Sequence, residues 1–368
     1  MALLIDQSTP HINLIYVDGG KVIFSDETDM TLDANYFIFL GGEFRAGLPN
    51  APYQHKLTIT LHGGYYDKQL PYFGNKVLGC QNCRFNMHGK VRTPTWTELS
   101  QTITPGSNTV KLIDAVDWVA GEHIAVAASG YNHFESEERI IIAVADAGKT
   151  LTVDKPFTYR HFSGVETYGG KDFVMRAEVG LLTRNIVIQG DNMSEVYNHG
   201  SHLMFMGKAA SGLDATLSYT KITQCGQPKI VGRYCSHFHM AGEVPNSFVR
   251  GIAVHHSHAR VLTIHGTHYL LVEKNVGFLV KGHNIFIEDG IETRNIIQDN
   301  LMISSIASLT LLQSDTSVAS YWITNPFNTV RRNHAAGGDF YGFWYEIKPN
   351  PDGPSATPNV CPTGMQLG

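Results

Sequence analysis

SHFHMAGEVPNSFVRGIAVHHSHARVLTIHGTHYLLVEKNVGFLVKGHNIFIEDG, residues 236–290, is the stretch that decides the fold. Its apolar and polar residues alternate in short runs that glycine interrupts. Alternation with a period of two is typical of β-strands, whereas an amphipathic helix repeats its apolar residues three and four positions apart. Eight of the 18 histidines of the chain also lie here. Histidines on short stacked strands indicate either a polar ladder in a solenoid or a binding site.

Strands return after roughly 20 residues from about position 172 onward, which is typical of a coiled solenoid such as a parallel β-helix. LLTRNIVIQGDN at 181–192 is echoed by ETRNIIQDNLMI at 292–303. Asparagines recur near the turns, and we expect them to form a structural ladder by hydrogen bonding to one another. They are Asn185, Asn275, Asn284, Asn295 and Asn300.

The first half of the chain predicts strands separated by Gly, Asn and Asp turns. The expected strands are 14–17, 21–24, 36–39, 56–61, 109–113, 123–127, 140–144 and 150–153. We therefore predict an all-β domain over 1–171 and a β-helix over 172–368 that ends in a Pro/Gly-rich loop. Because no linker separates the two parts, we expect them to pack continuously.

Composition and charge indicate which kinds of binding partner and which cellular location to expect. The 368 residues are 43% hydrophobic, carry a net charge of −5 and contain no Lys/Arg block, which argues against nucleic-acid binding. No apolar run approaches the roughly 20 residues of a membrane span. The first residues lack the pattern of a secretory signal, and we expect the chain to be a piece of a longer protein.

Five cysteines leave their pairing open. Cys80 and Cys83 form a single CxxC, which with His88 is a weak zinc signal, while Cys225 and Cys235 can pair across a loop. Disulfides suit an extracellular setting. Asn192-Met-Ser is a glycosylation sequon, which supports secretion mildly.

The histidine spacing predicts a metal site. His237 and His239 share one face of a strand, and His256 and His258 repeat that spacing about one coil later. Stacked strands lie about 4.8 Å apart, so we add His268 to the candidate ligands. Imidazole suits zinc, copper or nickel, whereas calcium prefers oxygen. Neutral histidines with hydrogen bonds inside the solenoid are the competing interpretation.

Carboxylates beside these histidines are candidates for glycosidic acid–base chemistry. Asp289 with Glu288 or Glu292 can supply the pair, and His265 or His283 can tune protonation. Adjacent residues of a strand point to opposite faces, which argues against joint action of Glu288 and Asp289. The same residues can instead form a turn or a calcium site.

Basic and aromatic side chains in the same region are candidates for binding an acidic glycan. Exposed ion pairs and core packing are the competing interpretations. The basic candidates are Arg260, Lys281 and Arg294, and the aromatic ones are Tyr269 and Trp344, with Trp322, Phe343 and Tyr345 beside them.

Several long motifs carry a family resemblance. GGEFRAGLPNAPYQHKLTITLHG (41–63) and residues 86–132 resemble a G8 domain, and MRAEVGLLTRNIVIQGD (175–191) resembles the junction that follows it. HFHMAG, VHHSHARVLTIHGTHYLLVEKNVG and GHNIFIEDGIETRN resemble the parallel β-helix repeats of the same family, and residues 319–355 resemble the stretch that follows in its fibrocystin-L branch.

The resemblance implies a G8 β-domain that continues into a right-handed parallel β-helix at the cell surface. The family also includes hyaluronidases, with calcium as an expected cofactor, and these share HFH, the IHGTH region and EDG. The migration-inducing hyaluronidase has an extra domain inserted in its G8 region. Residues 86–132 run straight through here, which favours the fibrocystin-L branch and puts hyaluronidase activity in doubt.

Three functions follow as hypotheses. The first is a structural, adhesive or glycan-binding extracellular module, whose partners are an acidic glycan, other surface proteins or further copies of itself. The second is a hyaluronan-cleaving enzyme, and the third is a solenoid stabilised by a divalent metal. GxSxG, P-loop and HExxH motifs are absent from the sequence.

Overall fold

The computed structural model describes residues 1–368 except 229, 309–312, 348–349 and 357–368. Strands dominate the described part, which also contains one α-helix, α1 (Met193–Tyr197), and short 3-10 turns. The all-β prediction is confirmed, and β3 (Lys21–Phe24) and β13 (Thr150–Val153) match predicted strands. Most of the predicted C-terminal loop lies outside the described residues.

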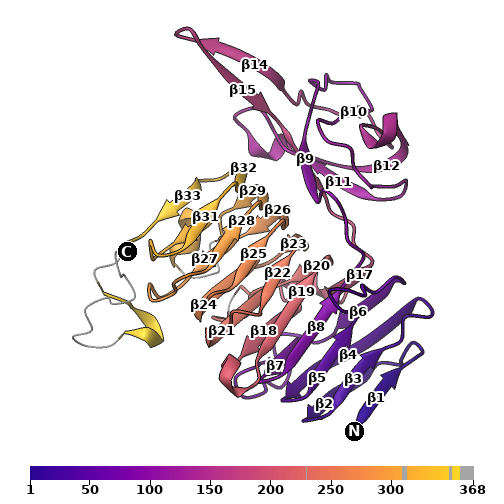
Figure 1. Cartoon of the computed structure of the whole chain (residues 1–368), viewed down its shortest axis with the longest axis vertical. Coiled ribbons are helices and arrows are strands. Elements are labelled where there is room, and N and C mark those ends of the chain that lie inside the picture. Colours follow the sequence, from indigo (N-terminus) through magenta and orange to yellow (C-terminus); the bar gives the residue numbers. More distant parts are fainter. Residues whose placement is uncertain (229, 309–312, 348–349, 357–368) are drawn as a thin grey trace.

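Three walls of parallel strands form a β-helix (Figure 1), and each complete coil gives one strand to each wall. Wall A contains β1 (Ala2–Ile5), β3, β5 (Glu43–Ala46), β8 (Arg84–His88), β19 (Asp214–Ser218), β22 (Phe248–Arg250), β25 (Leu271–Glu273), β28 (Ile296–Gln298) and β31 (Thr329–Arg331). Wall B contains β6 (Leu57–Leu61), β17 (Ile186–Gly190), β20 (Thr220–Cys225), β23 (Ala253–Ser257), β26 (Val276–Lys281), β29 (Leu301–Ile306) and β32 (His334–Gly338). Wall C contains β7 (Val77–Gln81), β18 (His202–Met206), β21 (Ser236–Glu243), β24 (Leu262–His268), β27 (Ile285–Ile287), β30 (Ala319–Ile323) and β33 (Tyr341–Tyr345).

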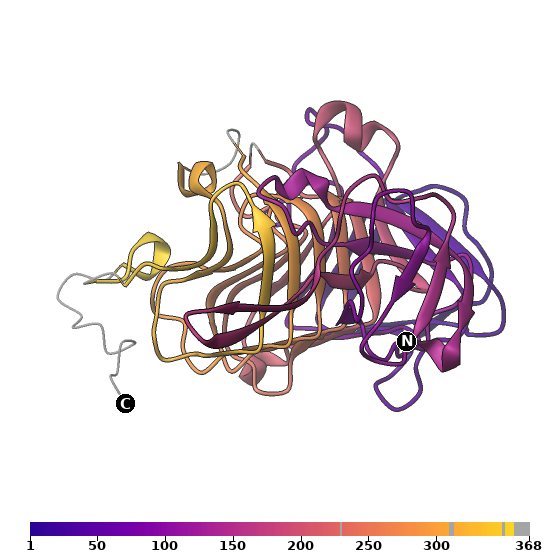
Figure 2. The ribbon, with the colours of Figure 1, turned by 90° about the horizontal axis from the view of Figure 1, so that it is seen from above.

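The repeat is longer than predicted. In wall A, Phe248 pairs with Leu271, and Leu271 pairs with Ile296, so each of these coils is a few residues longer than the sequence spacing suggests. The two echoed sequences also lie on different walls, since Ile186–Gly190 belongs to wall B and Ile296–Gln298 to wall A. Figure 2 shows the coils stacked in chain order along the solenoid.

The N-terminal strands are coils of the same solenoid. β4 (Met30–Leu40) joins walls B and C, pairs with β6 through its first half and β7 through its second, and also pairs with β2 (Ile12–Asp18). β6, β7 and β8 then pair with β17, β18 and β19. The sheets therefore do not divide at residue 172 as predicted, because strand patterns in the sequence do not reveal which distant strands pair.

An antiparallel sheet interrupts the solenoid between β8 and β17. Its strands are β9 (Trp96–Glu98), β10 (Thr109–Lys111), β11 (His123–Val126), β12 (Glu137–Ala145), β13 and β16 (Glu178–Leu181), with a hairpin of β14 (Ser163–Tyr168) and β15 (Lys171–Arg176). It has its own core around Trp118. Trp96 Nε1 donates to the carbonyl of Asp299, at 2.7 Å, and Thr95 to that of Lys274, at 2.6 Å, so the insertion is fastened to later coils.

A row of phenylalanine rings runs through the solenoid interior. Phe44, Phe85, Phe205 and Phe238 lie on successive coils, with neighbouring ring centroids 4.6–5.0 Å apart. All four side chains are completely buried. Burying such a ring stabilises the fold by about 1.5–3 kcal/mol, so each of these four rings contributes to holding successive coils together.

Asparagine ladders line the turns, as predicted. The side-chain amide of Asn275 donates to Oδ1 of Asn300, at 2.9 Å. The side-chain amide of Asn300 in turn donates to Oδ1 of Asn333, at 2.8 Å. Asn295 donates likewise to Asn328, at 3.0 Å. The ladder is not continuous through every predicted position, because Asn284 donates to Ser305 and Asn185 to the carbonyls of residues 53 and 55.

Candidate functional site

Neighbouring strands of wall C place His239, His265 and Glu288 in one column. His239 of β21 pairs with His265 of β24. The next strand continues this alignment, because Ile264 pairs with Ile287 and the N–H of Glu288 donates to the carbonyl of Ile264. Residues at equal positions on stacked strands lie side by side, so side chains far apart in the sequence converge.

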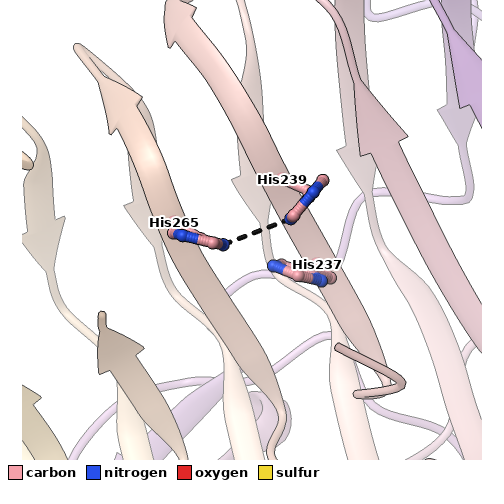
Figure 3. A group of neighbouring side chains, drawn as sticks. All are labelled: His237, His239 and His265. Carbon is pink, nitrogen blue, oxygen red and sulfur yellow. Dashed lines mark hydrogen bonds between the residues drawn. The ribbon is translucent and has the colours of Figure 1, made fainter. Parts of the chain in front are cut away.

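The rings of His237 and His239 on β21 and of His265 on β24 lie next to one another (Figure 3). Nδ1 of His239 lies 3.2 Å from Nδ1 of His265, and the His237 and His265 rings stack with centroids 5.8 Å apart. One ligand atom from each of the three histidines lies within 4.8 Å of the others. These residues are therefore able to hold a metal ion together.

Two carboxylates approach His265 from the turn after β27. Nε2 of His265 lies 2.9 Å from Oδ2 of Asp289, and Nδ1 lies 3.7 Å from Oε2 of Glu288. Their three ligand atoms lie within 4.8 Å of one another. The expectation that Glu288 and Asp289 face apart is wrong, because β27 ends at Ile287 and the turn removes the strand alternation.

Burial and charge separate the pKa values of the site. Burial raises the pKa of Glu288. Burial also acts to raise the pKa of Asp289, but the hydrogen bonds from His265 and Ser355 and the charge of His265 together outweigh it, and the pKa of Asp289 is lowered. Burial lowers the pKa of His239 to about 4. For His265 the lowering by burial is overcome by Asp289 and Glu288, and its pKa is raised. The two carboxyl groups that contact His265 therefore have pKa values shifted in opposite directions.

Two of the predicted metal ligands lie on another wall. Both residues come less than one coil after β21 and therefore lie on wall B. His256 is in β23, and His258 directly follows that strand. His256 is exposed and contacts His255 through Nδ1, at 2.7 Å. His258 is buried, with Nε2 3.8 Å from Glu195. The predicted repeat was too short, and it wrongly placed these two residues over His237 and His239.

Three further candidates, His268, Glu292 and His283, accept hydrogen bonds from backbone N–H groups. Nδ1 of His268 accepts from the N–H of Thr293, at 3.1 Å. Glu292, fully buried, accepts from the backbone N–H groups of Gly266, Asp289 and Gly290. His283 accepts from the N–H of Ala319, and burial lowers its pKa to about 3. All three side chains thus bind backbone groups, and the metal-ligand role of His268 and the catalytic roles of Glu292 and His283 stay predictions.

The structure does not support glycan contacts by Arg260, because its side chain is completely buried. Its guanidinium binds both oxygens of Asp315, at 3.1 and 2.6 Å, and lies over the Phe286 ring. Lys281 lies on wall B, where Nζ donates to Asn198. Trp344 stacks on Trp322 with centroids 5.7 Å apart, which agrees with the core-packing interpretation.

Tyr269 and Arg294 do come together, at successive turns between walls C and A. The Arg294 guanidinium carbon lies 5.5 Å from the Tyr269 ring centroid and 4.7 Å from that of Phe327. These residues line a pocket of about 420 Å³ with Pro326, Ile296, Asn328 and Thr329. The sequence did not single out Phe327, because it lies in a turn without a recognisable pattern.

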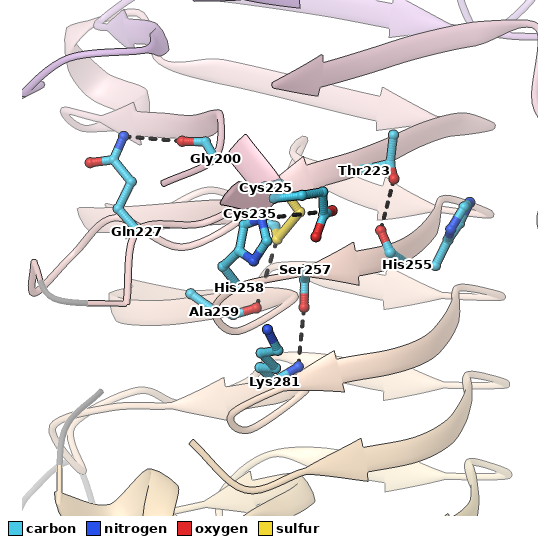
Figure 4. Close-up of a disulfide and its surroundings, with 11 residues drawn as sticks. Gly200, Thr223, Cys225, Gln227, Cys235, His255, Ser257, His258, Ala259 and Lys281 are labelled. Atoms are coloured by element: carbon cyan, nitrogen blue, oxygen red, sulfur yellow. Dashed lines mark hydrogen bonds and ion pairs between the residues drawn. A yellow bond between two sulfur atoms is a disulfide. The ribbon is translucent and has the colours of Figure 1, made fainter. Parts of the chain in front are cut away.

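Both cysteine pairs form disulfides. Cys80 is bonded to Cys83, and Cys225 is bonded to Cys235, the pair that Figure 4 shows. The weak zinc signal at Cys80 and Cys83 is therefore overturned. Asn192 is exposed immediately before α1, and its glycosylation stays a prediction. Among the described residues no helix is long and apolar enough to cross a membrane.

Comparison with known proteins decides the family. The model described as G8 domain matches residues 1–100, and the model described as CEMIP beta-helix matches residues 198–368. Fibrocystin-L of Mus musculus is 37% identical over 405 residues, covering 100% of this chain. The chain belongs to the G8-domain and β-helix family. It spans 10% of the length of that fibrocystin-L.

Similarity also extends to a G8-domain protein of another organism. A G8 domain-containing protein of Dictyostelium discoideum is 31% identical over 361 residues, covering 91% of this chain and 30% of that protein. Among solved structures, the tailspike gp61 of Pseudomonas phage phi297 covers 88% of this chain and 54% of its own, with 11% identity and a TM-score of 0.23. The G8 match coincides with the N-terminal coils and the first strand of the insertion.

Proposed function

We propose that the chain is an extracellular module of a larger fibrocystin-L-like protein and that it binds an acidic glycan in the pocket around Arg294. Two disulfides support an oxidising compartment, since such bonds are rare in reducing ones. The ladder of coils supports a rigid module that presents a fixed face to its ligand.

The Arg294 pocket is the observation that carries glycan binding. Arg294 is exposed and takes part in none of the ion pairs found among the described residues. A guanidinium presents a fork of N–H donors that matches a carboxylate. Tyr269, 37% exposed, adds a ring on which a sugar can stack. A charged donor beside aromatic rings suits a uronic acid better than a neutral sugar.

An Arg294→Ala variant is expected to bind hyaluronan oligosaccharides at least about tenfold more weakly, a loss of about 1.4 kcal/mol. The measurement is calorimetric titration at low salt, and binding by the wild type should weaken as salt screens the charge. Arg332→Ala is the matched control, because Arg332 is also exposed but is paired with Asp299. Equal affinity of the Arg294 variant and the wild type would exclude this pocket as the glycan site.

Hydrolysis of the glycan is the second candidate function. The oxygens of Glu288 and Asp289 lie within 4.8 Å of each other, close to the separation of about 5–5.5 Å in retaining glycosidases. Their opposite pKa shifts suit an acid beside an ionised partner. This candidate rests on those two carboxyl groups and not on Arg294.

Under the hydrolysis hypothesis, high-molecular-weight hyaluronan incubated with the purified chain and calcium becomes shorter. Asp289→Asn should slow the cleavage by about 100-fold or more, because it removes the ionised partner of His265. Gel electrophoresis of the polymer measures this. Unchanged polymer with wild-type chain counts against the enzyme and leaves the glycan-binding module as the function.

A further inference from the structure

We propose that His237, His239 and His265 bind a divalent transition metal, for which zinc is the best match. This inference goes beyond glycan binding and does not depend on it. The three rings converge from adjacent coils, as Figure 3 shows, and one ligand atom from each lies within 4.8 Å of the others.

Hydrogen bonds fix which nitrogen of two rings is available. Nδ1 of His237 lies 2.9 Å from the carbonyl oxygen of Gly232, which can only accept, so Nδ1 carries the proton and Nε2 keeps its lone pair. Nε2 of His265 donates to Asp289, at 2.9 Å, which directs its Nδ1 toward His239. Metal-binding histidines usually donate their second N–H to a carbonyl or a carboxylate in this way.

The separation of the remaining nitrogens fits a tetrahedral ion. Zinc–nitrogen bonds of about 2.0–2.1 Å place two ligand nitrogens about 3.3–3.4 Å apart. The two Nδ1 atoms of His239 and His265 are 3.2 Å apart. Without a metal this contact requires a proton on one of the two atoms, so an Nδ1–H of His239 donating to His265, or a protonated His265 donating to His239, is the competing explanation.

Unpartnered buried atoms lie around the same point. Among the described residues neither Nε2 of His237 nor Oε2 of Glu288 has a hydrogen-bond partner, and both atoms are buried. Leaving buried polar atoms unpaired is unfavourable, and a cation gives each of them a partner. Glu288 lies 3.7 Å from Nδ1 of His265, which makes its carboxylate the candidate for the fourth ligand or for holding a metal-bound water.

The donor set selects the class of metal. Three imidazoles with at most one carboxylate suit zinc and neighbouring transition metals, whereas calcium takes six to eight oxygen ligands. The calcium expected from the family resemblance does not fit this cluster. The carboxylates of Glu288 and Asp289 offset the charge of a divalent ion in this buried position.

Titration of chelator-treated whole chain with zinc chloride tests the site. We expect about one zinc per chain by calorimetry and elemental analysis, without competition from calcium chloride. His239→Ala, which removes the least buried of the three rings, should weaken binding by at least about 100-fold, and Asp289→Asn by about 10–100-fold. His256→Ala is the matched control and should bind like the wild type, because its ring lies on wall B.

The proposal is overturned if the wild type takes up no zinc or if His239→Ala binds zinc as tightly as the wild type. Circular dichroism checks the fold of each variant. A second measurement needs no variant. The wild type is loaded with cobalt(II), and its visible absorption spectrum is expected to be that of a tetrahedrally coordinated ion. Arg294→Ala should bind zinc normally, so failure of the glycan site and failure of the metal site are distinguishable.

Discussion

An Asp315→Ala variant is expected to lose about 3–5 kcal/mol of unfolding free energy, because it leaves the buried guanidinium of Arg260 without its counter-charge. Both side chains are completely inaccessible to solvent. Asp315 accepts two hydrogen bonds from Arg260 and one from the N–H of His283, at 3.0 Å. Urea unfolding followed by circular dichroism measures the change.

The matched control is Asp299→Ala, which breaks a pair of the same geometry on the surface. Arg332 donates from Nε and Nη2 to the two oxygens of Asp299, at 2.6 and 2.9 Å, but its side chain is 56% exposed. Solvent replaces the lost partner there. The expected loss is therefore only the cost of alanine at the left-handed φ of 58°, about 1–2 kcal/mol, and smaller than the loss for Asp315→Ala. Similar midpoints for the two variants would contradict the assignment of Arg260 and Asp315 as a buried pair that the fold depends on.

Acid should weaken the same interaction. Burial alone would raise the pKa of Asp315, but the charge and hydrogen bonds of Arg260, together with the charge and backbone N–H of His283, outweigh it, and the pKa is lowered. A carboxyl group with a lowered folded-state pKa contributes stability above its unfolded pKa of about 3.9, and that contribution is lost as the pH falls through the folded value. The difference in stability between Asp315→Ala and the wild type should therefore narrow at low pH.

An Asn300→Ala variant is expected to lose about 3 kcal/mol, because several buried polar groups lose their partners together. Asn300 is completely buried. Its side chain accepts from the backbone and side chain of Asn275 and donates to the carbonyl of Val272 and to Asn333. The ladder thus joins three coils, and the loss should appear as a lower urea midpoint.

Asn50→Ala, at an exposed position, is the control and should change stability by less than about 0.5 kcal/mol. Asn300→Asp adds a second test, because it keeps the acceptors and removes both donors to Val272 and Asn333. It is expected to be destabilised as well. If Asn300→Ala unfolds at the wild-type midpoint, the ladder contributes nothing to stability.

Local patterns in the sequence were sufficient to predict the strands and part of the asparagine ladder. Alternation at Lys21–Phe24 and Thr150–Val153 predicted both strands, because a pleated strand with one buried face needs apolar residues at every second position. The recurrence of asparagine at Asn275 and Asn300 predicted their stacking, since equal positions in successive coils are adjacent in space.

The candidate site was predicted only in part. His237 and His239 were correct neighbours because two residues on one strand share a face. Their third partner is His265, which pairs with His239 from the next strand of wall C, and not His256 or His258. A small difference in the length of the repeat moves a side chain to another wall, and the sequence did not reveal where each coil turns.

The sequence by itself determined that this chain folds as stacked short strands and that histidines and carboxylates gather on a few coils, because both properties follow from spacing along one segment. Tertiary structure alone decided that residues 2–88 belong to the same solenoid, that Arg260 is buried against Asp315, and that Glu288 and Asp289 both reach His265. These outcomes depend on which distant strands pair and where β27 ends. Pairing and register are set by the packing of whole coils, which no local pattern encodes.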